Sequence, residues 1–408
     1  MSCRNNTLTY STILASIFLA LFADVKTLNL IVVAAYSSFS GIFMTAMYAV
    51  IVIGLLIIGL FLQRRSFLKL RKSHWRICIL CTLWYIMTSV FIASPSVNIQ
   101  FFGIFMIAAF LIPGIIRIDV RTFLIALIVL PSIGILYLDR IFYGEIIETG
   151  VVSMGTCYAL LIPVLGNLVY LRFYYRNESI WMKIIMLFFA AINLFYLVQM
   201  AMFGSRGPIL CAVLLIMSFF IIQIDDNKRI LIRKGRVSII IIGLIFLISS
   251  FATILQSLQD FFSTFDISLN VVDKFLRLDD TGDMTNGRES LSTMAWKGIM
   301  ESPLWGNGIS QFNNNTGEGY PHNFVLQMLY DGGIILTLTI MAPITQSLIR
   351  KLKTVSENEF VCLMLLFFAS VPGSLFSGDL WNASTLWMFF GFVLAKNSVV
   401  EKSYSIKQ

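Results

Sequence analysis

The chain has 408 residues, of which 58% are apolar and 13% are charged, and its mean hydropathy is +0.83. A soluble domain carries about a quarter of its residues as charged side chains, so this composition excludes an ordinary soluble protein and predicts an integral membrane protein. The formal net charge is +8. No basic stripe alternates with exposed aromatic residues, so we expect no nucleic acid among the partners.

Apolar segments follow one another along the whole chain. They lie at residues 9–23, 29–62, 77–92, 101–116, 122–138, 151–171, 181–203, 208–224, 237–256, 323–346, 359–377 and 380–396. A helix needs about 20 residues to cross a hydrocarbon core of about 30 Å. We therefore expect an all-α polytopic membrane protein with about 12 transmembrane helices. The stretch 29–62 can hold two short helices, so the number of spans before residue 62 stays open.

Most of the 30 lysine and arginine residues lie in alternate loops, namely 63–76, 117–121, 172–183, 225–236, 350–358 and the tail from 396. The positive-inside rule assigns these loops to the cytoplasm. The outer face then holds short loops and one large loop. We divide the chain into an N-terminal helix bundle (1–256), a large outer loop with an amphipathic helix (257–322), and C-terminal helices with a cytoplasmic tail (323–408).

The short outer loop FGSRGP, at 203–208, is the first candidate for chemistry. Ser205 can cap the helix that follows, and Pro208 suits its first turn. The free N–H groups at a helix N-terminus attract anions, and Arg206 adds a fixed charge with parallel donors. Arg206 is therefore a candidate anion-binding residue. The alternative is an interfacial arginine that reaches the lipid headgroups.

The second candidate is the stretch TNGRESLSTMAWKGIMESPLWGNG, at 285–308. Its apolar residues recur at helical spacing, at Leu291, Met294, Ala295 and Ile299. The spacing predicts a short amphipathic helix lying on the outer leaflet, and Pro303 ends the pattern. Arg288 falls in the first turn of this helix, so a second cation lies beside a helix N-terminus. An ordinary solvated charge is the alternative for Arg288.

The third candidate is His322, one of only two histidines, within GEGYPHNFVLQMLYDGG. An imidazole titrates near pH 6.5, so it can take up a proton during a reaction at neutral pH. Asn323 starts the next span. Asp331 is the one acidic residue well inside a span, where a charge costs about 2.5–3.5 kcal/mol and usually faces a cavity or a partner. A structural, hydrogen-bonded histidine is the alternative for His322.

Two arginines and one histidine on one face indicate an anionic, phosphorylated substrate and a proton transfer. No group of carboxylates and histidines has the spacing of metal ligands. No glycine-rich phosphate loop lies on the cytoplasmic side. We therefore expect no metal and no cofactor, and we expect an activated donor to supply the energy.

The motifs GSRG, NGRESLSTMAWKGIMESPLWGNGISQF and PHNFVLQMLYDGG, in this order within roughly 200–345, resemble the superfamily of O-antigen ligases and O-antigen polymerases. The resemblance implies a GT-C-like enzyme of the bacterial inner membrane. It would transfer a glycan from undecaprenyl diphosphate on the periplasmic face, with inversion and without metal. Arg206 and Arg288 would bind the diphosphate, and His322 would orient or deprotonate the acceptor hydroxyl. Arg277, Asn323 and Asp331 are possible supporting residues.

Two positions depart from the superfamily pattern. Asp331 stands where glutamate is common, and Leu336 stands where a small residue often follows the Gly333 turn, which weakens the match to ligases. Further outer-face cations could hold a second lipid diphosphate, namely Arg140, Lys274, Arg277 and Lys297. These features favour a polymerase, which joins lipid-linked repeat units. The alternative is a ligase, which transfers the finished glycan to the lipid A core.

A transporter or flippase for the lipid-linked oligosaccharide is an alternative from a different class. Coupled transporters place ionisable groups and broken helices at the midplane, whereas here the polar residues concentrate in one outer loop. We expect the lipid-linked oligosaccharide and membrane lipids as partners. A chain-length regulator protein is a further candidate partner.

Overall fold

The computed structural model describes residues 10–35, 41–65, 70–137, 154–202, 206–224, 230–232, 235–236, 238, 260, 264 and 288–400. These residues are nearly all helical. They form two compact units, which are described separately. The first contains Met1–Val25, Phe39–Leu127 and Ser290–Gln408, and the second contains Lys26–Ser38 and Ile128–Glu289. The first unit thus combines the two ends of the chain. The predicted boundary at 256 lies outside the described residues.

Seven described helices are long and apolar enough to cross a membrane, or up to eight if the pair Tyr10–Ala23 and Val25–Val32, bent by 68°, is one span. Shorter apolar helices lie at Ile99–Ile115, Gly207–Ile221 and Ser384–Leu394. Each predicted apolar segment corresponds to described helices except 237–256, of which only residue 238 is described. The chain is therefore a multi-pass membrane protein, as predicted, while the count of about 12 spans and the GT-C-like fold stay predictions.

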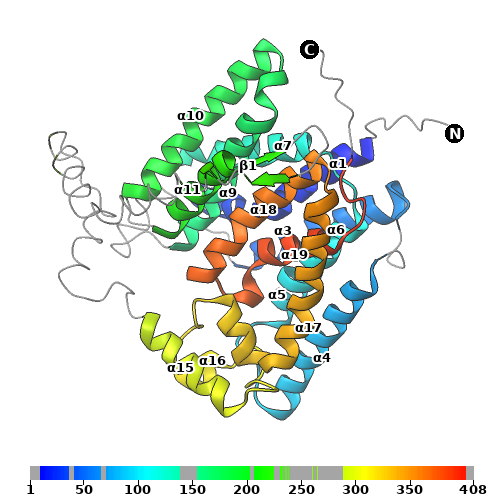
Figure 1. Ribbon diagram of the computed structural model, residues 1–408, viewed down its shortest axis with the longest axis vertical. Helices are drawn as coiled ribbons and strands as arrows, with labels where there is room; N and C mark the ends of the chain where they lie inside the picture. The colour runs from blue at the N-terminus through cyan, green and yellow to red at the C-terminus, as the bar shows by residue number, and fades with distance from the viewer. Residues whose placement is uncertain are drawn as a thin grey trace. The chain divides into compact units, whose positions relative to one another are not determined.

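The first unit holds the helices that lead to the candidate site. They are α1 (Tyr10–Ala23), α3 (Gly41–Ile57), η1 (Ile58–Leu62), α4 (Lys72–Phe91), α5 (Ile99–Phe101), η3 (Phe102–Ala108), α6 (Ala109–Ile115), the start of α7 (Val120–Ser132), α15 (Arg288–Glu301) from Ser290 on, α16 (Phe312–Thr316), α17 (Phe324–Thr354), α18 (Glu357–Phe376), η7 (Leu380–Asn382) and α19 (Ser384–Leu394). Helix α19 is apolar on every side and almost wholly buried, because α6, α17 and α18 all pack against it (Figure 1). A helix that is apolar all round needs such a central place.

The basic loops of the first unit lie together at one end. The Gln63 side chain donates to the carbonyl of Arg117 at 2.8 Å, and the Asn358 side chain donates to the carbonyl of Val400 at 3.1 Å. The backbone of Ile118 also pairs with the chain around Val400. Three loops that the charge rule assigns to the cytoplasm therefore meet the start of the C-terminal tail, as an alternating topology requires.

The loops assigned to the outer face also lie together in this unit. The hydroxyl of Ser96 contacts the carbonyl of Ser310 at 2.9 Å, and the hydroxyl of Tyr320 donates to the carbonyl of Ser377 at 3.2 Å. The loop after α4, the end of the large loop and the loop after α18 thus meet. The candidate His322 belongs to this group of loops.

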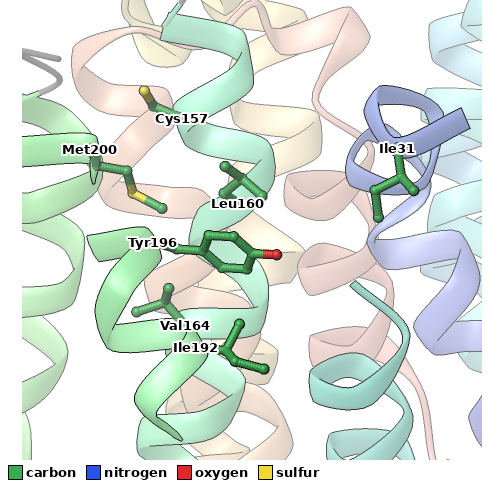
Figure 2. Packing of buried hydrophobic residues seen from close by; sticks show 7 residues of the cluster. All are labelled: Ile31, Cys157, Leu160, Val164, Ile192, Tyr196 and Met200. Carbon is green, nitrogen blue, oxygen red and sulfur yellow. The ribbon is translucent and has the colours of Figure 1, made fainter. Parts of the chain in front are cut away.

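The second unit packs around α9. Its elements are α2 (Val25–Ala35), the end of α7, η4 (Ile133–Tyr137), α9 (Met154–Phe173), η6 (Tyr175–Asn177), α10 (Ile180–Met202), α11 (Arg206–Ile221), and the antiparallel strands β1 (Ile222–Ile224) and β2 (Ile230–Ile232). The core of this unit, drawn in Figure 2, consists of Ile31, Cys157, Leu160, Val164, Ile192, Tyr196 and Met200. The ring of Tyr196 extends from α10 toward α9, and its hydroxyl donates to the carbonyl of Pro131 at 3.3 Å. This bond satisfies a buried polar group where no water is available.

Helix α17 is broken at Gly333, about 14 Å from its start at 1.5 Å per residue. Gly333 has φ 59° and ψ −164°, which no helix continues through. The break frees backbone groups that a straight helix would pair. The N–H of Ile334 donates instead to Pro303 O at 2.9 Å, and the N–H of Asn307 donates to Tyr330 O at 2.7 Å. The segment 303–308 therefore lies in the break and supplies the missing partners.

The segment 303–308, which we call the inserted loop, comes very close to the backbone of α17. A second set of bonds follows the first, from Ile335 N to Leu304 O at 3.3 Å and from Gly308 N to Asp331 O at 2.9 Å. Gly306 has φ +71°, and a Cβ on it would lie 2.5 Å from the carbonyl carbon of Asp331. Glycine is required there both by the conformation and by the lack of space.

We predict that Gly306→Ala lowers the free energy of unfolding by at least about 2 kcal/mol, because a positive φ and a backbone overlap both penalise the methyl group. Gly317→Ala is the matched control, since Gly317 has φ +77° but nothing within 4 Å of a Cβ. It should cost about 1 kcal/mol, from the conformation alone. Unfolding of the purified variants in detergent measures both, and equal losses would contradict the close approach.

Candidate functional site

His322 lies in the turn that joins α16 to α17. Its side chain is half-buried and its backbone has φ +56°, which is uncommon for a residue with a side chain. The ring of Tyr320 packs against the imidazole with 4.3 Å between the ring centroids and 50° between the planes. Pro321, between them, is buried. The imidazole is thus held at the outer end of α17 by its neighbours in the turn.

Asn323 caps α17, as its position before the span predicts. Its side-chain oxygen accepts from the N–H of Val325 at 2.9 Å and from the N–H of Leu326 at 3.2 Å. These bonds satisfy two of the N–H groups that a helix start leaves unpaired. The supporting role of Asn323 is therefore to start α17 directly after His322.

Three polar residues continue along one face of α17 at intervals of four, at Asn323, Gln327 and Asp331. Gln327 uses both ends of its amide, since Nε2 donates to Asp379 Oδ1 at 2.7 Å and Oε1 accepts from Leu380 N at 2.8 Å. These two hydrogen bonds connect α17, midway between its start and the break at Gly333, to the loop after α18.

Asp331 is fully buried inside α17, as the sequence indicates, and the structure identifies its partner. The indole Nε1–H of Trp381 donates to Asp331 Oδ2 at 2.5 Å. Trp381 is itself fully buried and its ring lies 5.9 Å from that of Trp387. A carboxyl group inside a span needs such a donor, because burial of an unpaired polar group is costly.

The loop 377–382 is therefore joined to residues 320–331 by three successive contacts, which we call the outer clasp. They are Tyr320 with Ser377, Gln327 with Asp379, and Asp331 with Trp381. Asp379 also accepts from the N–H of Trp381 at 3.2 Å and from the amide of Asn382. The outer clasp fixes the turn that carries His322 to the ends of α18 and α19.

Sequence reasoning alone misses Gln327, Asp379 and Trp381. The sequence does contain an indication of Gln327, because this residue lies midway between Asn323 and Asp331 on one helix face. Asp379 is the acidic residue of a short outer loop, which is a weaker signal. Nothing in the sequence pairs Trp381 with Asp331, because the two are far apart in the chain and only packing brings them together.

Arg288 begins α15, and this helix ends at Glu301, shortly before Pro303, as predicted. Of the four predicted apolar residues, Leu291, Ala295 and Ile299 pack against Phe312 and Tyr330, whereas Met294 is exposed. That α15 lies on the outer leaflet stays a prediction. Gly298 is buried beside them, and a Cβ on it would lie 2.3 Å from the Tyr330 ring, so the helix lies directly against α17. The other face of α15 exposes Trp296, Met300 and Lys297.

Arg206 is the first residue of α11, in the second unit. Gly207 follows it, and a Cβ there would lie 2.0 Å from the hydroxyl of Tyr158, so the first turn of α11 comes close to α9. Ser205 and Arg277 lie outside the described residues, as do Arg140 and Lys274.

The structure brings His322, Asn323 and Asp331 together along one helix of the first unit. Arg206 and Arg288 belong to the second unit, so their place in a common site with His322 is a proposal. Among the described residues, no three histidine, cysteine or acidic side chains lie close enough to hold a metal ion. The chemistry that the described geometry offers is that of a held imidazole among the loops that the charge rule assigns to the outer face.

Residues 191–341 match the family model described as O-antigen ligase. This region belongs to the superfamily of O-antigen ligases and polymerases. The resemblance predicted from the sequence motifs is thereby confirmed over the region that contains Arg206, Arg288 and His322. No curated protein matches the chain significantly.

The position that departs from the superfamily pattern at Leu336 lies inside the protein. Leu336 is 1% exposed, and its side chain covers Gly332, where a Cβ would lie 2.2 Å from Leu336 Cδ2. Leu336 thus packs the broken part of α17. The departure therefore concerns packing and does not alter the surroundings of the imidazole.

We predict that Trp381→Phe lowers the free energy of unfolding by about 2–3 kcal/mol, because it removes the indole donor from the buried Asp331 carboxyl group. Trp387→Phe is the matched control. Its indole N–H donates to the carbonyl of Leu380 at 2.9 Å, and its ring is equally buried. It should cost about 1 kcal/mol for a bond between neutral groups. Thermal unfolding in detergent compares them; an equal loss in both variants would argue against a special role for the Asp331 bond.

Proposed function

We propose that this protein is an O-antigen polymerase of the bacterial inner membrane, which joins undecaprenyl-diphosphate-linked repeat units on the periplasmic face. The family match supports a glycosyltransferase-like membrane enzyme. The observation that carries the proposal further is the single histidine on the outer face, held in a strained turn within the matched region. A fixed imidazole suits proton transfer from a sugar hydroxyl.

In the proposed reaction, His322 accepts the proton of an acceptor hydroxyl as that oxygen attacks the anomeric carbon of the donor glycan. The bond between the acceptor oxygen and the anomeric carbon forms while the bond to the lipid diphosphate breaks. The electron pair of the broken bond leaves with the diphosphate. Attack from the face opposite the leaving group inverts the anomeric centre.

Arg206 and Arg288 are proposed to hold the diphosphate. Each stands at the first residue of a helix, α11 and α15, where N–H groups and the positive end of the helix dipole favour an anion. A guanidinium adds paired donors that fit phosphate oxygens. These groups would stabilise the charge that develops on the leaving diphosphate. The proposed reaction uses no metal and no cofactor.

A ligase that transfers the finished glycan to the lipid A core is the second candidate, and the family match supports it equally. The additional cations Arg140, Lys274, Arg277 and Lys297 favour the polymerase, since a polymerase must bind two lipid diphosphates. The departure from the superfamily pattern at Leu336 favours the polymerase as well. The choice between polymerase and ligase is tested by the gene deletion described below.

A flippase is less well supported, although α17 is broken beside an acidic residue as the helices of transporters often are. In transporters such breaks line a cavity for the cargo. Here the inserted loop occupies the break at Gly333, and Trp381 binds Asp331. Purified protein in vesicles distinguishes these classes, because an enzyme makes a new glycosidic bond whereas a flippase moves the lipid-linked glycan unchanged.

We predict that His322→Ala remains folded and loses about 10²–10⁴-fold in the rate of glycan transfer, the usual contribution of a general base. The assay follows extension of a lipid-linked repeat unit by the purified protein, with thermal unfolding as the control for folding. Near-normal transfer by a folded His322→Ala would remove the imidazole from the mechanism.

Deletion of the gene tests the choice of acceptor. Loss of a polymerase should leave lipid A core carrying a single repeat unit, because ligation still occurs but extension does not. Loss of a ligase should leave core without any repeat. Electrophoresis of the surface glycans distinguishes these patterns, and complementation with the intact chain should restore long glycans.

A further inference from the structure

We propose that Tyr320 is the positioning residue of the base His322, and that the carbonyl of Ser377 at the end of α18 is its anchor. This inference rests on the proposed function, because it takes His322 as the base. Tyr320 would act on the reaction through the imidazole alone, without contact to the reacting atoms.

The first observation is the contact between the two rings. Their centroids are 4.3 Å apart and their planes are inclined by 50°, so the phenol covers one side of the imidazole. The two residues are separated by one buried proline, which restricts the backbone between them. The phenol therefore limits how far the imidazole can tilt or rotate.

The second observation is the anchor of the phenol itself. The hydroxyl of Tyr320 donates to the carbonyl of Ser377 at 3.2 Å. Ser377 ends α18, and its own N–H bonds to Gly373 O at 2.8 Å. Gly378, the next residue, packs directly against the last turn of α18, because a Cβ on it would lie 2.7 Å from the Cα of Ser374. The carbonyl that receives the hydroxyl is thus fixed by the end of a helix.

The third observation is the backbone of His322, at φ +56°. A residue with a side chain keeps such a conformation only where its surroundings determine it. The Asn323 cap holds the chain after the histidine, and the anchored phenol holds the chain before it. The ring of Tyr320 is fixed at both ends, by its backbone and by its hydroxyl, so it can transmit the rigidity of α18 to the imidazole.

This rigidity matters for proton transfer, because the base must stay within about 2.6–3.2 Å of the oxygen that it deprotonates. A displacement of about 1 Å can cost on the order of 100-fold in rate. Loss of positioning therefore lowers kcat. It leaves KM nearly unchanged, because Tyr320 is not assigned a contact with the substrate.

The test compares Tyr320→Phe, which removes only the anchor, with Tyr320→Leu, which also removes the ring. We expect kcat to fall about 3–10-fold in the first variant, as for one lost hydrogen bond. In Tyr320→Leu we expect kcat to fall about 10–100-fold, because the imidazole is no longer held in position. KM should stay within about 2-fold in both. Neither change should lower the residual activity of His322→Ala further, since residues that act as a unit are not additive.

Tyr85→Phe is the matched control, because Tyr85 also belongs to the first unit and donates its hydroxyl to a loop carbonyl, that of Val97, at 3.0 Å. Its kcat should stay within about 2-fold of wild type. Tyr320→Phe isolates the effect on kcat if Tyr320→Leu proves unstable.

Three results would overturn the inference or separate it from the proposed function. Unchanged kcat in both Tyr320 variants, with an inactive His322→Ala, would overturn the positioning role and leave the proposed function intact. An equal loss of kcat in Tyr85→Phe and Tyr320→Phe would reduce Tyr320 to a general structural role. Normal activity of His322→Ala would instead overturn the proposed function itself.

Discussion

The requirement that every backbone group inside a membrane find a partner within the protein governs the described outer half of the first unit. Helix α17 stops being helical at Gly333, in the middle of a span, and the break would leave N–H and carbonyl groups exposed to lipid. The inserted loop 303–308 supplies those partners at hydrogen-bond distance. Because Gly306 and Gly333 let two backbones approach this closely, the end of the large outer loop is fixed to the helix that follows it.

A second constraint follows from Asp331, which lies next to the break and is fully buried. Its carboxyl group needs a donor, and Trp381 provides one from the loop after α18. Gln327 and Tyr320 continue the same connection toward the outer face. The outer clasp thus extends from the centre of the span to the turn of His322. The imidazole gains its rigidity from contacts that begin deep in the helix bundle, far from any chemistry that it performs.

The proposed reaction gives a chemical reason for a rigidly held imidazole. A sugar hydroxyl is a weak nucleophile, so a base must be held close to it, and a diphosphate leaves only if its charge is stabilised. Helices α11 and α15 each begin with an arginine, which suits an anion at a helix N-terminus. Helix α15 is also attached to α17 through Gly298 and Tyr330. Packing against α17 therefore sets the position of this helix within the first unit.

The membrane class, nearly all the helices, the starts of α11, α15 and α17, and the family of residues 191–341 follow from the amino-acid sequence alone, because hydrophobic length, capping residues and motif spacing act locally along the chain. The sequence also indicated His322 and the buried acid Asp331. The folded structure was needed to show that α15 packs against α17, that the inserted loop fills the break in α17, and that Trp381 binds Asp331. Those contacts join residues far apart in the chain, and local patterns carry no information about which distant partner satisfies a buried group.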